Sequence, residues 1–256
     1  MRQVLEYFGE FFYLLWDMLC AIGPALWTGR GRRMAWRNLW IQMNRIGVDS
    51  IPIVGLVMFC IGAILAMQMA PELAKFGIIP VTADVVALAT FREMGPLVSA
   101  VVMTGFGGAA ITAEIGTMVV GEEIEAMETM AIDPIRYLVV PRVLAGMVML
   151  VCLTALGDMA SLFGGLVTSA LLLHLGAQQY IHHALEILKI GDFLTGLMKA
   201  AVFGVLISAI ACFLGLKVHG GAEGVGVNTS KTVVFTIVAL IVVDLMFTAL
   251  FFYLGV

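Results

Sequence analysis

The chain has 256 residues, of which 61% are hydrophobic and only 12% are charged, and its mean hydropathy is +1.04. Soluble domains carry about 25% charged residues, so an ordinary soluble enzyme or a disordered regulator is excluded. The net charge of −4 includes no long run of either sign, so we expect no nucleic-acid partner. Apolar blocks of about 20 residues predict a polytopic all-α membrane protein.

The first segment of the chain is amphipathic. Between residues 2 and 26, polar side chains recur every three or four positions and apolar side chains fill the other face. This pattern predicts a helix that lies in the membrane interface and not a cleavable signal peptide. A basic, tryptophan-containing stretch follows at residues 30–45, as is typical of a segment beside cytoplasmic headgroups.

Hydropathy and helix breakers then predict five spans. We place them at residues 51–70, 85–112, 143–172, 193–216 and 233–254. Pro71 and Pro80 are expected to mark the first external turn, and Asp133 with Pro134 to stop a helix in the second connection. The whole chain, 1–256, is expected to be one domain, with an interfacial part at 1–48 and a membrane bundle at 49–256.

The last two connections differ in composition. A short outer helix is expected between His174 and Asp192. The glycine-rich stretch from Lys217 to Lys231 is expected to form a flexible loop. Three polar residues at the end of this loop are expected to cap the last span: Asn228, Thr229 and Ser230.

The distribution of lysine and arginine predicts the orientation. With the N-terminus in the cytoplasm, ten of these residues fall on the cytoplasmic side and two, Lys75 and Lys189, in outer loops. This positive-inside bias places the C-terminus on the outer side of the membrane.

Small residues and cysteines give weaker signals. Spans two and four carry a small residue at every fourth position, which predicts close contact between helices inside the bundle or, alternatively, a dimer seam. The members of these two faces are Ala100, Thr104, Gly108 and Thr112, and Gly196, Ala200, Gly204 and Ser208. The four cysteines stand singly in apolar sequence and are expected to be buried free thiols.

The connection between spans two and three carries a short acidic segment. Strong helix formers between Gly121 and Asp133 predict a cytoplasmic helix at about 121–132, with Ile124, Met127 and Ala131 on its apolar face. Such a helix is either a solvated surface element or a docking element for a cytosolic partner. The candidate docking residues are Glu122, Glu123, Ile124, Glu125, Met127 and Glu128.

Several motifs together resemble the MlaE/YrbE family of ABC-type phospholipid permease subunits. They are Glu93-x-Gly95-Pro96, the run Ala113-Glu114-Ile115-Gly116-Thr117-Met118, the acidic helix, Asp133-Pro134 with residues 140–145, the loop 221–229, and Asp244. The resemblance covers nearly the whole chain. One departure is Phe106, which stands where many members of the family have an arginine.

The resemblance implies a set of partners and a role for each part. It implies an inner-membrane homodimer that binds two cytosolic ABC ATPase subunits, a small STAS-domain protein and a periplasmic hexamer of MCE-domain lipid carriers. Phospholipid would be the substrate, and the acidic helix would be the coupling helix that fits the ATPase. The sequence itself contains no Gly-x-x-x-x-Gly-Lys-Ser/Thr loop, so ATP is expected on the partner and no cofactor or enzymatic site on this chain.

Five ionisable residues fall within the predicted spans: Arg92, Glu93, Asp158, Lys199 and Asp244. Counting about 1.5 Å per residue places all five in one layer of the outer half of the membrane. They are either ionic locks between helices or the polar lining of an outward-facing cavity for a lipid headgroup. Arg92 is the best candidate for a phosphate contact, because a guanidinium matches phosphate oxygens in a bidentate way.

Other functions are less well supported by the residues. A proton-coupled secondary transporter that uses Glu93, Lys199 and Asp244 is the alternative, although five spans are few and no inverted repeat is visible. His182 and Glu186 are one helical turn apart, but no third metal ligand is close to them in the sequence.

Overall fold

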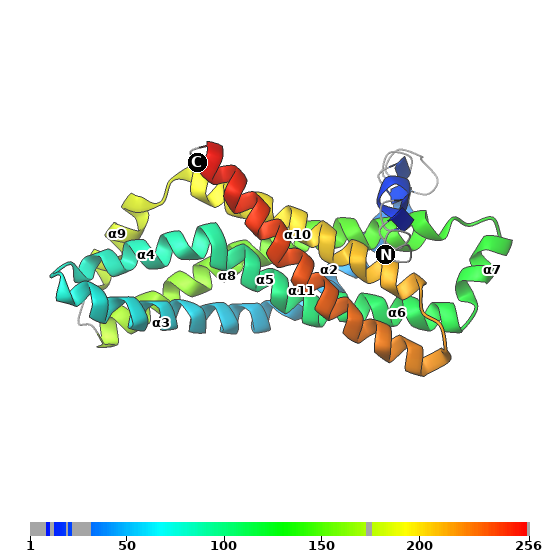
Figure 1. The fold of residues 1–256 in the computed structure, drawn as a ribbon, viewed down its shortest axis with the longest axis horizontal. Helices are drawn as coiled ribbons and strands as arrows, with labels where there is room; N and C mark the ends of the chain where they lie inside the picture. The colour runs from blue at the N-terminus through cyan, green and yellow to red at the C-terminus, as the bar shows by residue number, and fades with distance from the viewer. Residues whose placement is uncertain (1–8, 11–12, 19, 22–31, 173–175, 255–256) are drawn as a thin grey trace. The chain divides into compact units, whose positions relative to one another are not determined.

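The computed structural model describes residues 9–10, 13–18, 20–21, 32–172 and 176–254, and all regular elements among them are helical. Five helical stretches are long and apolar enough to cross a membrane (Figure 1). They are Trp36–Lys75, Ile79–Val120, Ile135–Leu172, Ile190–Leu216 and Gly221–Leu254. The polytopic all-α prediction is confirmed. The described part of the N-terminal interfacial segment is helical, and the rest of that prediction lies outside the described residues.

The first stretch consists of α2 (Arg32–Ile46), η1 (Val48–Ser50) and α3 (Ile51–Lys75). The prediction that Pro71 marks the first turn is wrong, because Pro71 lies inside α3. A proline removes one helical hydrogen bond, but a membrane helix tolerates this loss since neighbouring groups and local adjustments satisfy the freed backbone. The chain turns instead at Gly77, whose φ of +72° favours glycine.

The second stretch alternates between α- and π-helical geometry. It runs through η2 (Ile79–Val81), α4 (Thr82–Ala89), η3 (Thr90–Met94), α5 (Gly95–Met103), η4 (Thr104–Gly108) and α6 (Ala109–Val120), where η3 and η4 are π-helical. Residues 113–120, which we expected in the following connection, therefore extend the span. In lipid the chain gains from satisfying every backbone group within the helix, so helices continue through residues that hydropathy alone places outside.

The third and fourth stretches follow the short helix α7 (Glu123–Thr129) and the π-helical η5 (Ile135–Val139). Asp133 does not stop a helix, because α7 has already ended; its Oδ1 accepts the Ile135 backbone N–H at 3.0 Å and begins the next helix. The elements α8 (Val140–Leu172), α9 (Ala177–Ile187) and α10 (Ile190–Leu216) come next. Helix α9 confirms the short helix expected between spans three and four.

The glycine-rich connection before the last span is much shorter than predicted. Helix α11 (Gly221–Leu254) begins directly after Gly220, and φ values of +90° and +71° at Gly220 and Gly221 make the turn. The capping prediction for Asn228, Thr229 and Ser230 is wrong, because these residues lie inside α11. A Cβ atom at Gly224 would lie 1.9 Å from the His219 carbonyl oxygen, so this glycine allows the tight hairpin and is no sign of a loop.

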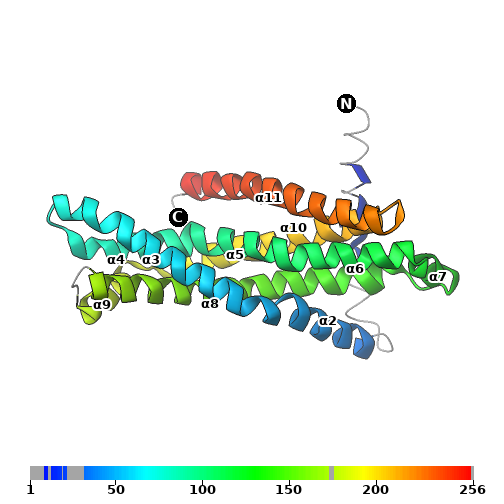
Figure 2. The ribbon, with the colours of Figure 1, turned by 90° about the horizontal axis from the view of Figure 1, so that it is seen from below.

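The chain divides into two compact units, and α8, α10 and α11 contribute residues to both. Unit 1 contains Met1–Asp49, Met103–Met149 and Gly204–Leu240, and unit 2 contains Ser50–Val102, Leu150–Phe203 and Ile241–Val256. In unit 1, Phe213 and Leu214 of α10 belong to a buried cluster. In unit 2, α9 packs on α4 through Ala83, Ala87, Tyr180 and Ala184. Helix α3 also packs on α4 (Figure 2).

The small-residue faces of spans two and four are used inside the protomer. Ala100, Thr104 and Thr112 are fully buried, as are Ala200 and Ser208. A Cβ atom added at Gly204 would lie 2.5 Å from the Gly146 carbonyl oxygen, so α10 and α8 touch backbone to backbone. The structure therefore favours the bundle interpretation of these faces over the dimer seam.

The cysteine prediction is wrong for three of the four residues. All are free thiols, but Cys20, Cys60 and Cys152 are exposed and only Cys212 is buried. A thiol behaves as a small apolar group, and an apolar helix face directed at lipid accepts it as readily as a protein interior does.

Substituting Gly204 tests the contact between α8 and α10. We expect Gly204→Ala to destabilise the protein by about 1–3 kcal/mol, because the new methyl group meets fixed backbone atoms. The measurement is the midpoint of thermal unfolding of the detergent-purified protein. Gly55→Ala in α3 is the matched control, since nothing lies within 4 Å of the added Cβ there. Equal midpoints for the two variants would contradict the close contact.

Candidate functional site

Lys199 is the buried centre of a partly buried polar cluster in unit 2. Its side chain is 1% exposed, and its Nζ donates to Glu93 Oε2 at 2.7 Å, Asp244 Oδ1 at 2.9 Å and Thr248 Oγ1 at 3.0 Å. Thr248 Oγ1 in turn donates to Glu93 Oε1 at 3.0 Å. An ammonium group has three N–H donors, so all of them have an acceptor. Two carboxyl groups therefore share one ammonium group.

The local backbone explains how Glu93 reaches Lys199. Pro96 has no N–H to donate to the preceding turn, and the helix widens to π geometry at η3 just before it. A Cβ atom at Gly196 would lie 2.2 Å from the Phe91 carbonyl oxygen, so α10 approaches η3 at backbone distance. Lys199, one turn further along α10, then lies within hydrogen-bonding distance of Glu93.

Arg92 has a different partner. Its Nε donates to Asp192 Oδ1 at 2.7 Å, and its Nη2 lies 2.5 Å from the same oxygen. Asp192 Oδ2 accepts the Lys189 backbone N–H at 3.1 Å, so the carboxylate is held in the first turn of α10. The Arg92 side chain remains 46% exposed, whereas Asp192 is 4% exposed. One edge of the guanidinium is thus fixed while much of the group stays accessible.

Sequence reasoning missed Asp192. Its signal was its position directly before an apolar span, which is also the signal of an ordinary helix-capping residue. Only the approach of η3 to the start of α10, more than 90 residues apart in sequence, makes it the partner of Arg92.

Asp158 does not join the other predicted charges. It lies in α8, is 2% exposed, and its Oδ1 has no hydrogen-bond partner. A Cβ atom at Gly95 would lie 1.9 Å from this oxygen, so the glycine leaves the space that the carboxyl group occupies. All five predicted residues belong to unit 2, but only Glu93, Lys199 and Asp244 form one cluster. Whether any of them contacts lipid stays a prediction.

The acidic helix α7 is shorter than predicted. Glu122 precedes it with a left-handed φ of 58°, and Ala131 follows it with the same value. Met127 is buried and Glu123, Glu125 and Glu128 are exposed, as the amphipathic pattern indicates. The assignment of Ala131 to the apolar helix face is wrong, because Ala131 lies in the turn beyond the helix and is exposed.

A partly buried ionic junction connects the helices on either side of α7. Glu114 Oε1 in α6 lies 3.0 Å from Arg45 Nη1 in α2 and 3.1 Å from Arg142 Nη2 in α8. The Arg142 side chain is 4% exposed and also donates to the Leu138 carbonyl at 2.9 Å. One carboxylate therefore links the helices before and after α7 to α2. The sequence shows the motif around Glu114 and both arginines, but not that they pair with this carboxylate.

Two further points of the sequence analysis concern Phe106 and metal binding. Phe106, in the π-helical segment η4, is 41% exposed, so this departure from the family places an aromatic ring on an accessible surface. Among the described residues, no group of three or more His, Cys, Asp or Glu side chains could hold a metal ion.

Five stretches of the chain are long and apolar enough to cross a membrane, and α7 is a short acidic helix between the second and the third of them. A family model described as "Permease MlaE" matches residues 39–250. The chain belongs to the MlaE permease family, and it is therefore a permease subunit of an ABC transporter, a class that works with a partner ATPase.

Curated relatives agree with this assignment. A probable ABC transporter permease protein of Rickettsia typhi is 36% identical over 211 residues, which is 82% of each chain. One from Synechocystis is 37% identical over 216 residues, covering 84% of this chain and 82% of the relative. The chloroplastic protein TRIGALACTOSYLDIACYLGLYCEROL 1 of Arabidopsis thaliana is 31% identical over 220 residues, covering 86% and 63% of the two chains.

Substitutions in the Lys199 cluster test its ionic character. We expect Lys199→Met to destabilise the protein by about 1–3 kcal/mol, because it leaves two partly buried carboxyl groups without their cation. Combining it with Glu93→Gln and Asp244→Asn should restore most of the loss. Thermal unfolding in detergent measures both effects. The control is Lys75→Met, which removes an exposed pair with Glu72 and should change little; equal losses for Lys199→Met and Lys75→Met would show that the cluster is not a buried ionic lock.

Proposed function

We propose that this chain is the membrane subunit that moves phospholipid between a bacterial inner membrane and a periplasmic carrier, with energy from a separate ATPase. Membership of the MlaE family supports the ABC mechanism. The name of the Arabidopsis relative includes that of a diacylglycerol lipid, which agrees with a lipid substrate. Other parts of the proposal, the STAS-domain protein, the MCE-domain carrier hexamer, the cytoplasmic N-terminus and the periplasmic C-terminus, rest on the resemblance and on the positive-inside count.

The observation that carries the lipid assignment is the geometry of Arg92. A charge within a membrane-spanning helix is costly and normally faces a cavity or a partner. Arg92 has a partner, Asp192, yet 46% of its side chain is accessible. A phosphodiester can accept hydrogen bonds from the open edge of the guanidinium while Asp192 holds the other edge. The saturated Lys199 cluster would then serve as the fixed polar wall beside it.

Replacing the guanidinium tests this role. In liposomes that contain this chain and its ATPase, we expect Arg92→Lys to lower ATP-driven phospholipid transfer at least about tenfold, because an ammonium group cannot reproduce the two-oxygen contact. Arg136→Lys is the control, since Arg136 pairs with Asp133 outside the bundle interior. Undiminished transfer by the Arg92 variant would remove Arg92 from the substrate path.

The same liposomes separate the proposal from a proton-coupled carrier. Phospholipid transfer should require ATP and the ATPase, and a pH gradient applied to this chain alone should drive none. Transfer driven by the gradient without ATPase would favour the alternative that uses Glu93, Lys199 and Asp244.

Helix α7 is proposed to couple the permease to the ATPase. Helix α7 carries exposed acidic side chains and follows α6 after a short turn. Glu114 of α6 pairs with Arg45 of α2 and Arg142 of α8, so force on α7 would reach three helices. We expect Glu125→Lys with Glu128→Lys to abolish co-purification of the ATPase while the membrane part stays folded. Both residues are exposed.

The control for the coupling test makes the same change of net charge elsewhere. Glu72→Lys with Glu186→Lys reverses two exposed carboxylates outside α7. Co-purification of an active ATPase with the α7 variant would overturn the coupling assignment. Loss in both variants would show that only net charge matters.

We also propose that the functional unit is a homodimer. The small-residue faces are occupied within the protomer, but the final part of α11 carries large exposed apolar side chains, including Ile241, Leu245 and Met246 at 56%, 70% and 66%. These side chains offer a second copy of the chain an apolar surface. We expect a Leu245→Cys variant in a cysteine-free background to form a disulfide-linked dimer, and the absence of cross-linking would contradict a contact at this position.

A further inference from the structure

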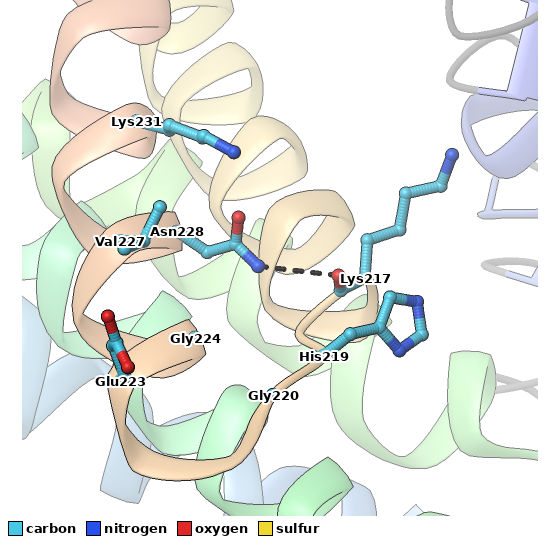
Figure 3. A pocket seen from close by; sticks show the side chains of 8 residues that line it. All are labelled: Lys217, His219, Gly220, Glu223, Gly224, Val227, Asn228 and Lys231. Atoms are coloured by element: carbon cyan, nitrogen blue, oxygen red, sulfur yellow. Dashed lines mark hydrogen bonds between the residues drawn. The ribbon is translucent and has the colours of Figure 1, made fainter.

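Two adjoining hollows lie where α11 begins. The first, of about 370 Å³, is lined by Lys217, His219, Gly220, Glu223, Gly224, Val227, Asn228 and Lys231 (Figure 3). The second, of about 460 Å³, is lined by Gly226, Val227, Ser230, Lys231, Val234 and Phe235. Val227 and Lys231 line both hollows, so the two lie next to each other along α11.

The first hollow is polar and is shaped by the hairpin. Asn228 Nδ2 donates to the Lys217 carbonyl at 3.3 Å and holds the start of α11 against the end of α10. Gly220 and Gly221 present bare backbone there, with nothing within 4 Å of an added Cβ. The first N–H groups of a helix lack partners within the helix and attract anions. The hollow therefore offers backbone and side-chain donors together.

Lys231 is the cation that is available in this hollow. Lys217 contacts Glu10 and lies 4.6 Å over the Phe213 ring, so its charge is already compensated, and burial lowers its pKa. Lys231 is exposed and forms no ion pair with any acidic residue of the described chain. Figure 3 shows its side chain extending from α11 over Asn228, with Glu223 at the opposite edge. A lysine close to a membrane surface attracts the headgroups of anionic lipids.

The second hollow is an apolar groove along the next turns of α11. Gly226 leaves its floor open, since nothing lies within 4 Å of an added Cβ. Val227, Val234 and Phe235 form its sides and are 47%, 59% and 53% exposed. A groove of this kind beside an unpaired cation is complementary to an amphiphile, whose charged group and hydrocarbon chain are joined.

We propose that the hairpin between α10 and α11 binds an anionic phospholipid, with its phosphate at Lys231 and one acyl chain in the groove of Gly226, Val234 and Phe235. The site shares no residue with the Arg92 and Lys199 groups that we propose for transport. The bound lipid is thus a resident of the membrane interface and not the transported molecule, and the inference stands independently of the proposed function.

The test measures lipid binding to the full-length protein in detergent. The probes are dioctanoyl phosphatidylglycerol, dioctanoyl phosphatidylcholine, glycerol 3-phosphate and inorganic phosphate, with native mass spectrometry as the readout. We expect phosphatidylglycerol to bind more tightly than the other three, and Lys231→Gln to weaken it about fivefold, the effect of one lysine at a lipid surface. Lys75→Gln, another exposed lysine, should leave the affinity unchanged, and Lys231→Arg should retain it.

A second variant tests the groove separately. Gly226→Leu should fill the groove and weaken phosphatidylglycerol while leaving any binding of glycerol 3-phosphate unchanged. Equal affinities for phosphatidylglycerol and inorganic phosphate would overturn the proposal, because they would describe a phosphate site without an acyl groove. Equal affinities of Lys231→Gln and Lys75→Gln would also overturn it. A change of Gly226→Leu from dimer to monomer with unaltered lipid binding would assign the groove to a second copy of the chain.

Discussion

An ammonium group that is fully removed from water needs an acceptor for each of its protons, and Lys199 meets this constraint inside a membrane-spanning bundle. Its three acceptors come from η3 and α11, so one side chain of α10 fixes the relative position of three chain segments within unit 2. The energy of such a cluster lies mainly in the penalty for breaking it. The cluster therefore specifies one arrangement of helices and leaves little freedom for an alternative one.

Close contact between backbones is what makes this cluster possible. Gly196 allows α10 to reach η3 in unit 2, and Gly146 with Gly204 allows α8 to meet α10 in unit 1. Since lipid supplies no hydrophobic force between helices, small residues and polar links must provide their association. The Glu114 junction is such a polar link in unit 1, where a single carboxylate pairs with two arginines from different helices.

The sequence predicted the number of spans and their helical nature because both depend on composition over about 20 residues. It could not predict where each helix ends, since Pro71, Gly224 and Gly226 are breakers in water but lie within helices here. The charged candidates were also visible as residues, and the partnership of Glu93, Lys199 and Asp244 agreed with the ionic-lock interpretation. The separation of Arg92 from them depends on the direction in which its side chain leaves the helix, which the π-helical turn η3 changes. The separation of Asp158 depends on the packing of α8 against Gly95, which the sequence does not show.

The π-helical segments η3, η4 and η5 have a consequence for how this chain can vary. Each π turn accommodates one residue more than the α-helical turn it replaces. Removal of a single residue within such a segment can therefore convert it to α-helix without breaking the span. The residues on the two sides of it would keep nearly the same rotation relative to each other, because five π-helical residues turn the chain about as far as four α-helical ones. The same deletion in an α-helical part of the second span would turn one side by about 100° and change which side chains face the bundle. The π-helical segments are therefore where this span tolerates a change of length with its faces preserved.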